Sequence, residues 1–339
     1  MGIVIKLEKE KAATSAMTAL SDLVAPELDA VNDLIVKQLE SDIKLIPEIG
    51  NHLIEAGGKR LRPMLTLATA HMCGYQGGQR HVMLASCVEF LHTATLLHDD
   101  VVDESELRRG KPTANQIFGN QAAILVGDYL ISKSFHMLVH DGSIEVLKVL
   151  SDAAVVIAAG EVLQLEVQNE IATSEDDYLR VIESKTAALF AAACEISAVL
   201  TDQPDAERKA LSDYGRFLGV AFQLVDDALD YRASQAALGK TVGDDFREGK
   251  ITLPVVLAWR RGDEEERKFW ARVMGGAKQK RKDFDRALEL MDKHGTLDDT
   301  IERARHYGDR AKDALLLFPQ SAERDALQDI VDFCISRAY

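Results

Sequence analysis

The sequence predicts an all-α protein, a single large helical bundle domain over residues 1–339. Apolar residues recur at the three-to-four spacing of an amphipathic helix nearly everywhere, and prolines fall between these periodic segments. No run alternates as a half-buried strand does, and no long linker divides the chain. Hydrophobic residues make up 47% of the 339, enough for a sizeable core. We therefore expect about ten helices or more.

The first half of the chain predicts helices separated by proline and glycine. From Leu28 to Leu39, apolar residues recur on one helix face, and Pro47 and Gly57 interrupt the stretch that follows. Helices are expected over residues 28–45, 63–73, 82–107, 120–140 and 151–169. The last two are rich in apolar and small side chains, which favours burial and close packing.

The second half continues the helical pattern. Ser174 and Asp177 form a capping signal that opens a helix, and Pro254 suits the first turn of another, where no N–H is needed. Helices are expected over residues 175–200, 207–232 and 251–261, with several amphipathic helices in 264–337. The glycine-containing stretch 233–250 is expected to be a loop.

Composition excludes several classes of protein. Lys plus Arg number 40 and Asp plus Glu 55, a net charge of −15, and aromatic residues are only 6%, so nucleic-acid binding is disfavoured. The four cysteines form no CxxC pair, which argues against a zinc knot and suits a reducing compartment. The N-terminus lacks a signal-peptide pattern, and no uncharged apolar run reaches about 18 residues, so we expect no transmembrane segment. The expected location is the cytoplasm.

Two aspartate clusters stand out. Asp99, Asp100 and Asp103 lie within an apolar helix, where positions four apart share a face. Alone, this DDxxD could equally be a solvated helix end. The same spacing recurs at Asp226, Asp227 and Asp230 on a second apolar helix, which surface charge does not explain. Facing each other, the two clusters would form a pocket of carboxylate oxygens that suits Mg²⁺.

Two basic segments accompany the aspartates. Gly57–Pro63 places glycines beside Lys59 and Arg62, a pattern that suits a phosphate but is also common in basic turns. Arg108 and Arg109 follow the first aspartate cluster, either as a salt-bridged helix end or as a clamp on bound anions. One acidic, metal-bridged anion site and one basic site together suit a reaction between two phosphorylated substrates.

At this point the chain resembles the trans-type isoprenyl diphosphate synthases. The resemblance runs through GGKRLRP, HTATLLHDDVVDES, LRRGKPT, ESKTAALF, FQLVDDALD and GKTVGDDFREGKITLP, and long-chain members that make quinone side chains are the most similar. It implies an isoprenoid synthase fold around a central cavity, usually as a homodimer. It implies Mg²⁺-dependent elongation of an allylic diphosphate, with farnesyl diphosphate the expected primer, by isopentenyl diphosphate to a polyprenyl diphosphate for ubiquinone. Transient membrane contact could release the product.

The resemblance also implies roles for individual residues. The metal ligands would be Asp99, Asp100, Asp103, Asp226, Asp227 and Asp230. The isopentenyl diphosphate site would comprise Gly58, Lys59, Arg62, His92 and Arg109. The allylic diphosphate would meet Arg108, Lys185, Thr186, Gln223 and Lys240, and two of these, Lys185 and Lys240, would help to stabilise the leaving group. His98, close to the aspartates in sequence, is expected to support the site from behind.

Product length should depend on the helix that precedes Asp99. Leu91, Ala94 and Thr95 share one stretch of its surface. The resemblance implies that short-chain enzymes close their cavity with a bulky aromatic near the Ala94 position, so small side chains here favour a longer tunnel. Phe135 on the neighbouring helix is the candidate floor of that tunnel.

Three alternatives remain at this stage. A class I terpene cyclase also uses a DDxxD, but it has no need of the GGKRLRP site. A shorter-chain synthase, such as a geranylgeranyl enzyme, would share every motif. A non-catalytic partner subunit of a prenyl synthase tends to lose aspartates, and both clusters are intact here.

Overall fold

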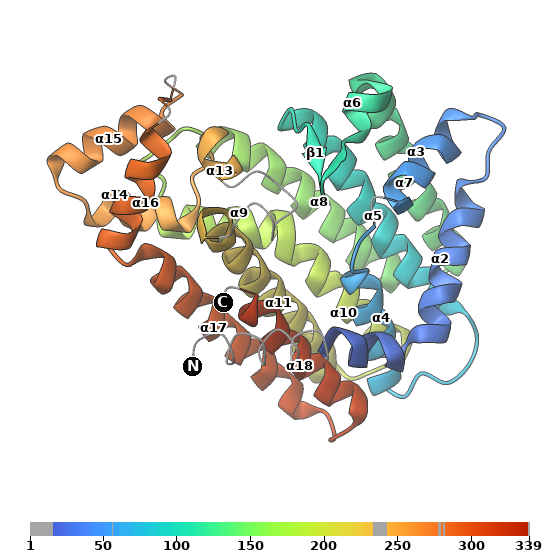
Figure 1. Ribbon diagram of the computed structural model, residues 1–339. Coiled ribbons are helices and arrows are strands. Elements are labelled where there is room, and N and C mark those ends of the chain that lie inside the picture. Colours follow the sequence, from blue (N-terminus) through green and yellow to red (C-terminus); the bar gives the residue numbers. More distant parts are fainter. Residues whose placement is uncertain (1–15, 56, 233–242, 277–278, 281, 338–339) are drawn as a thin grey trace.

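The computed structural model describes residues 16–55, 57–232, 243–276, 279–280 and 282–337, and these are almost entirely helical (Figure 1). The all-α prediction is confirmed. In the first half the helices are α2 (Ala25–Leu39), α3 (Leu45–Glu55), α4 (Leu61–Met72), α5 (Arg80–Val102), α6 (Ala114–Phe118), α7 (Asn120–Asp141) and α8 (Ile144–Val167). In the second half they are α9 (Glu175–Ile182), α10 (Ala188–Leu200), α11 (Asp205–Arg232), α13 (Asp244–Arg247), α14 (Leu253–Arg261), α15 (Glu264–Met274), α16 (Asp283–Lys293), α17 (Thr296–Ala314) and α18 (Ala322–Ser336).

Local chemistry explains where several of these helices begin. The Ser174 side chain accepts a hydrogen bond from the backbone of Asp177, which satisfies an exposed donor at the start of α9. Asp263 and Glu266 form a reciprocal capping box at the start of α15. Pro254 lies in the first turn of α14, as expected.

The expected helix over 82–107 is too long, because α5 ends at Val102. A short hairpin follows, in which β1 (Leu107–Arg108) pairs antiparallel with β2 (Lys111–Pro112). Its two-residue turn, Arg109 and Gly110, has φ of 54° and 76°, as in the turns that match strand twist. Both arginines that follow the first aspartate cluster therefore lie on this hairpin and not on a helix.

The expected helix over 175–200 is interrupted. A π-helical segment, η1 (Glu183–Ala187), separates α9 from α10 and carries Lys185 and Thr186. Such insertions widen the turn locally and are frequent at functional sites. Gly160 of α8 permits its close approach, because a Cβ at that glycine would lie 2.6 Å from the Ser184 side chain.

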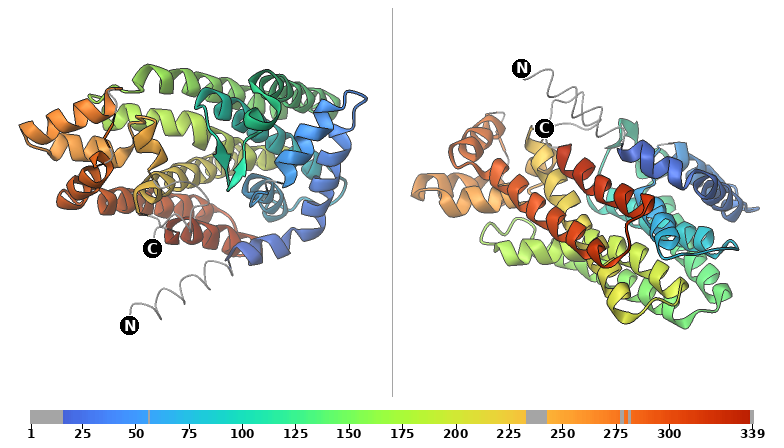
Figure 2. Two further views of the ribbon diagram at one scale, coloured as in Figure 1. Left: turned by 45° about the horizontal axis from the view of Figure 1, so that its top comes forward. Right: turned by 90° about the horizontal axis from the view of Figure 1, so that it is seen from below.

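The buried side chains form two hydrophobic clusters around α11. One joins α2, α4, α5, α7, α8 and α10 to the first half of α11, which contributes Leu218, and the other joins α9 and α14–α17 to its second half, which contributes Leu224. In both views of Figure 2 the group α14–α16 lies at the opposite end of the molecule from α2 and α3. Helix α17 packs along α11, and α5 packs along α7. The two aspartate clusters sit on α5 and α11, at the centre of this arrangement.

Within the described residues, one helix, α7, is long and apolar enough to cross a membrane by length and composition alone. Buried residues make up 39% of its most apolar window. A core helix passes the same test, and α7 packs against α5 here.

Candidate active site

A cavity opens between the ends of α8, α9 and α11, with η1 and residues 248–252 completing its wall. It holds about 720 Å³ of empty space, its open mouth included. Both aspartate clusters reach it, through Asp103 of α5 and Asp227 of α11. The structure therefore brings together two motifs that lie more than a hundred residues apart in sequence.

The first aspartate cluster occupies the C-terminal end of α5. Asp100 is buried and forms a two-pronged ion pair with the Arg108 guanidinium, at 2.7 Å from Nη2 to Oδ1 and 3.1 Å from Nε to Oδ2. Arg108 thus has the role of a salt-bridged residue beside the helix end. Asp99 lies 3.4 Å from the Lys185 ammonium. Burial raises the pKa of Asp99, and Lys185 partly offsets this effect.

Lys185 connects the first cluster to α8. Its Nζ donates to Oε2 of Glu161 at 2.7 Å, while the other oxygen of that carboxyl is buried without a hydrogen-bond partner. Burial and the nearby Asp99 raise the pKa of Glu161 to about 7. Although burial alone would lower the pKa of Lys185, the carboxylates of Asp99 and Glu161 outweigh it and keep the ammonium charged.

The second aspartate cluster lies on α11. Asp227 is buried and accepts hydrogen bonds from the Tyr178 hydroxyl at 2.6 Å and from the Gln223 amide at 2.7 Å. The Thr186 hydroxyl donates to the other end of the same amide at 2.9 Å. Burial raises the pKa of Asp227 to about 6. The sequence-predicted residues Thr186, Gln223 and Asp227 therefore form one continuous network on the cavity wall.

The other two aspartates of this cluster have different surroundings. Asp230 is buried and accepts a hydrogen bond from the backbone N–H of Asp245 at 3.1 Å. Asp226 is half-exposed and lies 3.1 Å from the Arg337 guanidinium near the C-terminus. Asp230 thus faces α13 and Asp226 faces the chain end, whereas Asp227 faces the cavity.

Lys250 and Glu248 face the same cavity, and the sequence analysis assigned neither to the site. Burial alone would lower the pKa of Lys250, but Asp245, Asp227 and Asp103 outweigh it and raise that pKa. Burial, together with nearby carboxylates, raises the pKa of Glu248 to about 7. Because both aspartate clusters act on it, Lys250 lies where an anion bridging them would bind. Lys250 could have been found from the sequence, because it lies in the EGKITLP stretch that carries the family resemblance.

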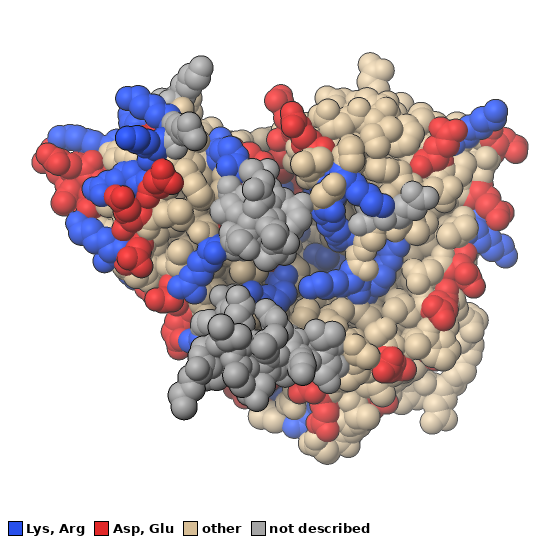
Figure 3. All heavy atoms as spheres, viewed as in Figure 1, with Lys and Arg blue, Asp and Glu red and all other residues tan. Residues whose placement is uncertain are grey.

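The basic site gathers around α4 and the hairpin. A Cβ at Gly58 would lie 2.9 Å from the Arg109 guanidinium, so a larger residue there would displace this flexible side chain. Lys59 lies over the Phe333 ring, 4.7 Å from Nζ to the centroid, and burial together with the nearby Arg337 lowers its pKa. On the face of the molecule that Figure 3 shows, Lys and Arg side chains gather near the middle.

Arg62 and His92 form the floor of the basic site. The Arg62 guanidinium lies 4.2 Å from the centre of the Phe190 ring and 3.2 Å from Nε2 of His92. Burial lowers the pKa of Arg62 to about 10, so it remains charged at neutral pH. Burial and the nearby arginines, Arg62 first, hold the pKa of His92 well below its usual value, so the ring is neutral and can still donate one hydrogen bond.

Some predicted residues lie elsewhere. Lys240 falls outside the described residues. Leu91 and Ala94 are buried in the first hydrophobic cluster, while Phe135 packs against its edge, and these residues and Thr95 are away from the cavity described above. His98 faces α7, where its Nε2 lies 3.1 Å from the Ile124 carbonyl oxygen. It therefore supports α5 from behind.

The donor set at the cavity fits a hard divalent cation. Asp103 and Asp227, one from each cluster, offer carboxylate oxygens to the cavity, and no histidine or cysteine is among the residues that line it. Burial, with a smaller contribution from neighbouring carboxylates, raises the pKa values of Glu161 and Asp227, and one Glu161 oxygen has no hydrogen-bond partner. A cation between the clusters would relieve both conditions.

The raised carboxyl pKa values give a testable pH dependence. Glu161 and Glu248 titrate near 7 when folded but near 4.5 when unfolded, so the folded state binds more protons between these values. Stability of the metal-free protein should therefore fall as pH rises from about 4.5 to 7. Melting temperatures measured across this range in chelator should show the decline, and added Mg²⁺ should reduce it. An unchanged decline with Mg²⁺ would show that these carboxyls are remote from the metal.

Comparisons with known proteins agree with this geometry. The polyprenyl synthetase family matches residues 43–291. Octaprenyl diphosphate synthase of Escherichia coli (strain K12) is 46% identical over 318 residues, which are 94% of this chain and 98% of that protein.

Two solved structures share the fold. A polyprenyl synthase from Caulobacter crescentus, complexed with calcium and isoprenyl diphosphate, superposes with a TM-score of 0.92 at 47% identity, covering 95% of this chain and 98% of the other. A decaprenyl diphosphate synthase from Rhodobacter capsulatus gives a TM-score of 0.91 at 49% identity, covering 95% and 99%. The chain therefore has the isoprenoid synthase fold and belongs to the polyprenyl synthetase family, as a long-chain trans-prenyltransferase of the octaprenyl and decaprenyl diphosphate synthase type.

Proposed function

We propose that the protein uses Mg²⁺ to elongate farnesyl diphosphate with successive isopentenyl diphosphates, giving a long-chain all-trans polyprenyl diphosphate. The observation that carries the proposal is the pairing of two unlike anion sites. A carboxylate cavity with Lys185 and Lys250 at its wall suits a metal-bridged diphosphate. Beside the hairpin, Lys59, Arg62 and Arg109 suit a second diphosphate that needs no metal.

The chain's residues divide the chemistry between these sites. Bound Mg²⁺ would neutralise the charge that grows on the departing diphosphate. Lys185 and Lys250 hold ammonium groups beside it, where that charge develops. Val181, Ile182 and Ile251 line the cavity with apolar surface that excludes water from the allylic cation. The basic site would hold isopentenyl diphosphate so that its double bond attacks that cation.

Loss of a proton completes each addition. The described residues at the cavity offer no histidine paired with a carboxylate as a base. The resemblance to the isoprenyl diphosphate synthases implies that the departing diphosphate takes this proton, and we propose the same for this chain.

A direct assay tests the proposal. Purified protein would be incubated with isopentenyl diphosphate and farnesyl diphosphate, with Mg²⁺ or with chelator, and the dephosphorylated products separated by chromatography. Long-chain prenols formed only with Mg²⁺ would support it. Geranylgeraniol alone, or products independent of metal, would contradict it. Geranyl diphosphate in a parallel reaction compares the primers.

Lys59→Ala should chiefly weaken the binding of isopentenyl diphosphate. Its ammonium lies at the basic site over the Phe333 ring, and a charge-assisted contact is worth about 1.5–3 kcal/mol, or roughly tenfold or more in affinity. Steady-state kinetics should show a raised KM for isopentenyl diphosphate and a nearly unchanged KM for the allylic substrate. Arg62→Ala should act in the same direction, with an added cost from lost packing on Phe190.

The matched control is Lys148→Ala. Lys148 is an exposed lysine paired with Asp152 on α8, and its loss should leave the KM values for both substrates unchanged. If Lys59→Ala weakened the binding of both substrates equally, the assignment of two separate sites would be wrong.

We also propose that the protein is a homodimer that pairs through α7 and α8. Exposed apolar side chains concentrate on these helices, with Leu125 66%, Val155 70% and Val162 58% exposed. Leu125→Glu should shift the sedimentation coefficient from that of a dimer toward that of a monomer. The same shift with the surface control Lys133→Glu, or none with either, would place the interface elsewhere.

The proposed setting follows from the product. A long-chain polyprenyl diphosphate suits the side chain of ubiquinone, and its apolar tail requires brief membrane contact for release. We propose that the enzyme is located in the cytoplasm. We also propose that residues 1–339 form one domain, because α11 contributes to both hydrophobic clusters.

A further inference from the structure

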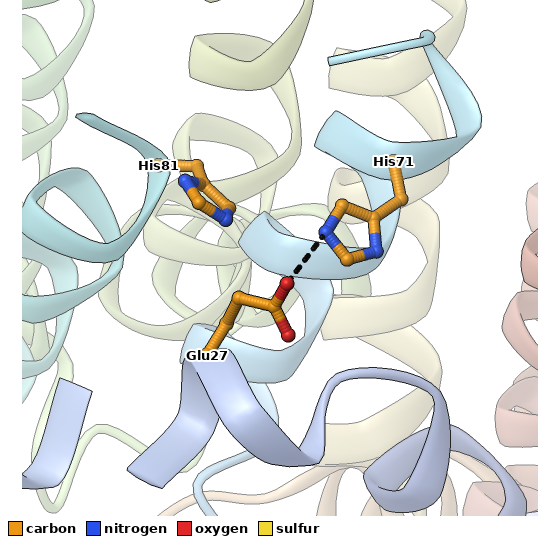
Figure 4. Close-up of side chains that lie close together, drawn as sticks. All are labelled: Glu27, His71 and His81. Carbon is orange, nitrogen blue, oxygen red and sulfur yellow. Dashed lines mark ion pairs between the residues drawn. The ribbon is translucent and has the colours of Figure 1, made fainter. Parts of the chain in front are cut away.

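Three metal-ligating side chains meet at a place the catalytic chemistry does not use. Glu27 of α2, His71 of α4 and His81 of α5 point toward one another (Figure 4). One ligand atom from each lies within 4.8 Å of the other two. Three helices that are separate in sequence therefore present two imidazoles and a carboxylate to one point.

The innermost histidine of this cluster, His81, is buried and lacks a hydrogen bond at one ring nitrogen. His81 is only 5% exposed, and its Nδ1 is buried without a hydrogen-bond partner. The Tyr75 ring packs against it at 4.7 Å between centroids, which restricts its rotation. Burial, followed by the neighbouring His71, lowers its pKa, so the ring is neutral near pH 7, the form that binds metals.

The front of the cluster is open to water. The side chains of His71 and Glu27 are 23% and 27% exposed, and their facing atoms, Nε2 and Oε1, lie 3.4 Å apart. Ligand atoms of a tetrahedral zinc ion lie about 3.3 Å apart, given its bond lengths of about 2.0 Å. Two of the three ligands therefore already have the separation that zinc requires, and the third, within 4.8 Å of both, needs a shift of at most about 1.5 Å.

We propose that Glu27, His71 and His81 form a site for Zn²⁺, with water as the fourth ligand. Imidazole nitrogen favours Zn²⁺ over Mg²⁺, whereas the aspartate clusters offer only oxygen, so the two sites select different metals. His81 precedes Asp99 by 18 residues on the same straight helix, about 27 Å, so the zinc lies at the far end of α5 from the substrates. Its effect is to tie α2 to α4 and α5.

The main rival is a plain ion pair. A protonated His71 beside Glu27 would explain their 3.4 Å separation without any metal. That pair involves only His71 and Glu27, whereas a metal would also bind one nitrogen of the buried His81 ring. The two interpretations differ in whether zinc binds, and in what geometry.

The test uses the full chain, stripped of metal with chelator and kept in excess Mg²⁺ to occupy the carboxylate cavity. Equilibrium dialysis against Zn²⁺, followed by metal analysis, should show one tightly bound zinc per chain. Co²⁺ in its place should give the intense visible absorption of a four-coordinate site, not the weak bands of a six-coordinate oxygen site. Zinc should also raise the melting temperature, because it binds only the folded state.

His71→Gln and Glu27→Gln are the variants of choice, because both side chains are partly exposed and the replacements keep their bulk. Each should weaken zinc binding about a hundredfold or more and abolish both the cobalt spectrum and the zinc-dependent rise in melting temperature. The control His306→Gln removes an exposed histidine of α17 and should behave as wild type. Prenyl transfer in Mg²⁺ should be unchanged in all three.

Two results would overturn the site. One is zinc binding of equal strength in wild type and in both variants, with their fold verified by circular dichroism. The other is a wild-type protein whose cobalt complex shows only six-coordinate bands. Neither result would touch the proposed prenyl transfer, which is measured separately in Mg²⁺.

Discussion

Asp99→Asn is expected to lower turnover in Mg²⁺ by orders of magnitude while the fold remains intact. The amide has the shape of the carboxyl but lacks the anionic oxygen that a hard cation requires. Asp99 also neighbours Lys185, at 3.4 Å, so its loss removes charge balance from the residue that faces the leaving group. Asp226→Asn on α11 should have a similar effect. Steady-state rates with isopentenyl and farnesyl diphosphates measure both variants.

The same substitution should leave the metal-free protein as stable as wild type or more so. Burial raises the pKa of Asp99, which means that the ionised carboxyl is unfavourable there until a cation binds. Melting temperatures in chelator report this difference. Asp152→Asn, on the exposed face of α8, is the control and should change neither rate nor stability. A wild-type rate for Asp99→Asn in Mg²⁺ would refute a metal shared between the clusters.

Periodicity was enough to predict the main helices, and the repeated DDxxD spacing pointed to the two that carry the aspartates. If the two clusters faced each other, they would form one pocket of carboxylate oxygens. The structure places Asp103 and Asp227 on one cavity, as this reasoning predicts. The family resemblance, and not the basic motifs alone, assigned Gly58 and Arg109 to one site, and the structure brings the two together.

Local irregularities could not be predicted in this way. The π-helical segment carries Lys185 and Thr186, which line the cavity, and its close approach to α8 requires the missing side chain of Gly160. The hairpin strands are two residues long, too short to alternate, and their Arg-Gly turn is not a common hairpin signal. Such features arise from tertiary contacts.

The side-chain partners of the site residues also could not be predicted from the sequence. Glu161 looks like one acidic residue on an amphipathic helix, and only the fold brings it within 2.7 Å of Lys185. Tyr178 becomes a partner of Asp227 for the same reason. Lys250 lay in a stretch that carries the family resemblance, yet its role depends on the carboxylates that three other segments bring toward it.

Ala94→Phe is expected to shift the product sharply downward, toward farnesyl or geranylgeranyl diphosphate, while isopentenyl diphosphate is still consumed. The growing chain must leave the metal site between helices, and Ala94 lies a little more than one turn before Asp99 on α5. It is fully buried, so a phenyl ring there must occupy space that a chain between α5 and α7 would use. Chromatography of dephosphorylated products measures the change.

The packing of α5 on α7 shows why the wall beyond Ala94 matters. Near the metal site, Nε2 of His98 lies 3.1 Å from the Ile124 carbonyl oxygen. Farther along, the Ser134 hydroxyl donates to the Cys87 carbonyl at 3.2 Å. The helices therefore run antiparallel, and Phe135 lies level with Cys87, about 10 Å beyond Ala94 at 1.5 Å per residue.

Phe135→Ala should consequently lengthen the product, because it opens the interface deeper than Ala94. Ala304→Phe on α17 is the matched control, since Ala304 is equally buried but belongs to the other hydrophobic cluster. It should lower stability by overpacking, about 1–3 kcal/mol, without shortening the product. If Ala94→Phe also destabilised the protein but left product length unchanged in the active fraction, Ala94 would be a packing residue only. A product shortened by Ala94→Phe and lengthened by Phe135→Ala would instead place the growing chain between α5 and α7.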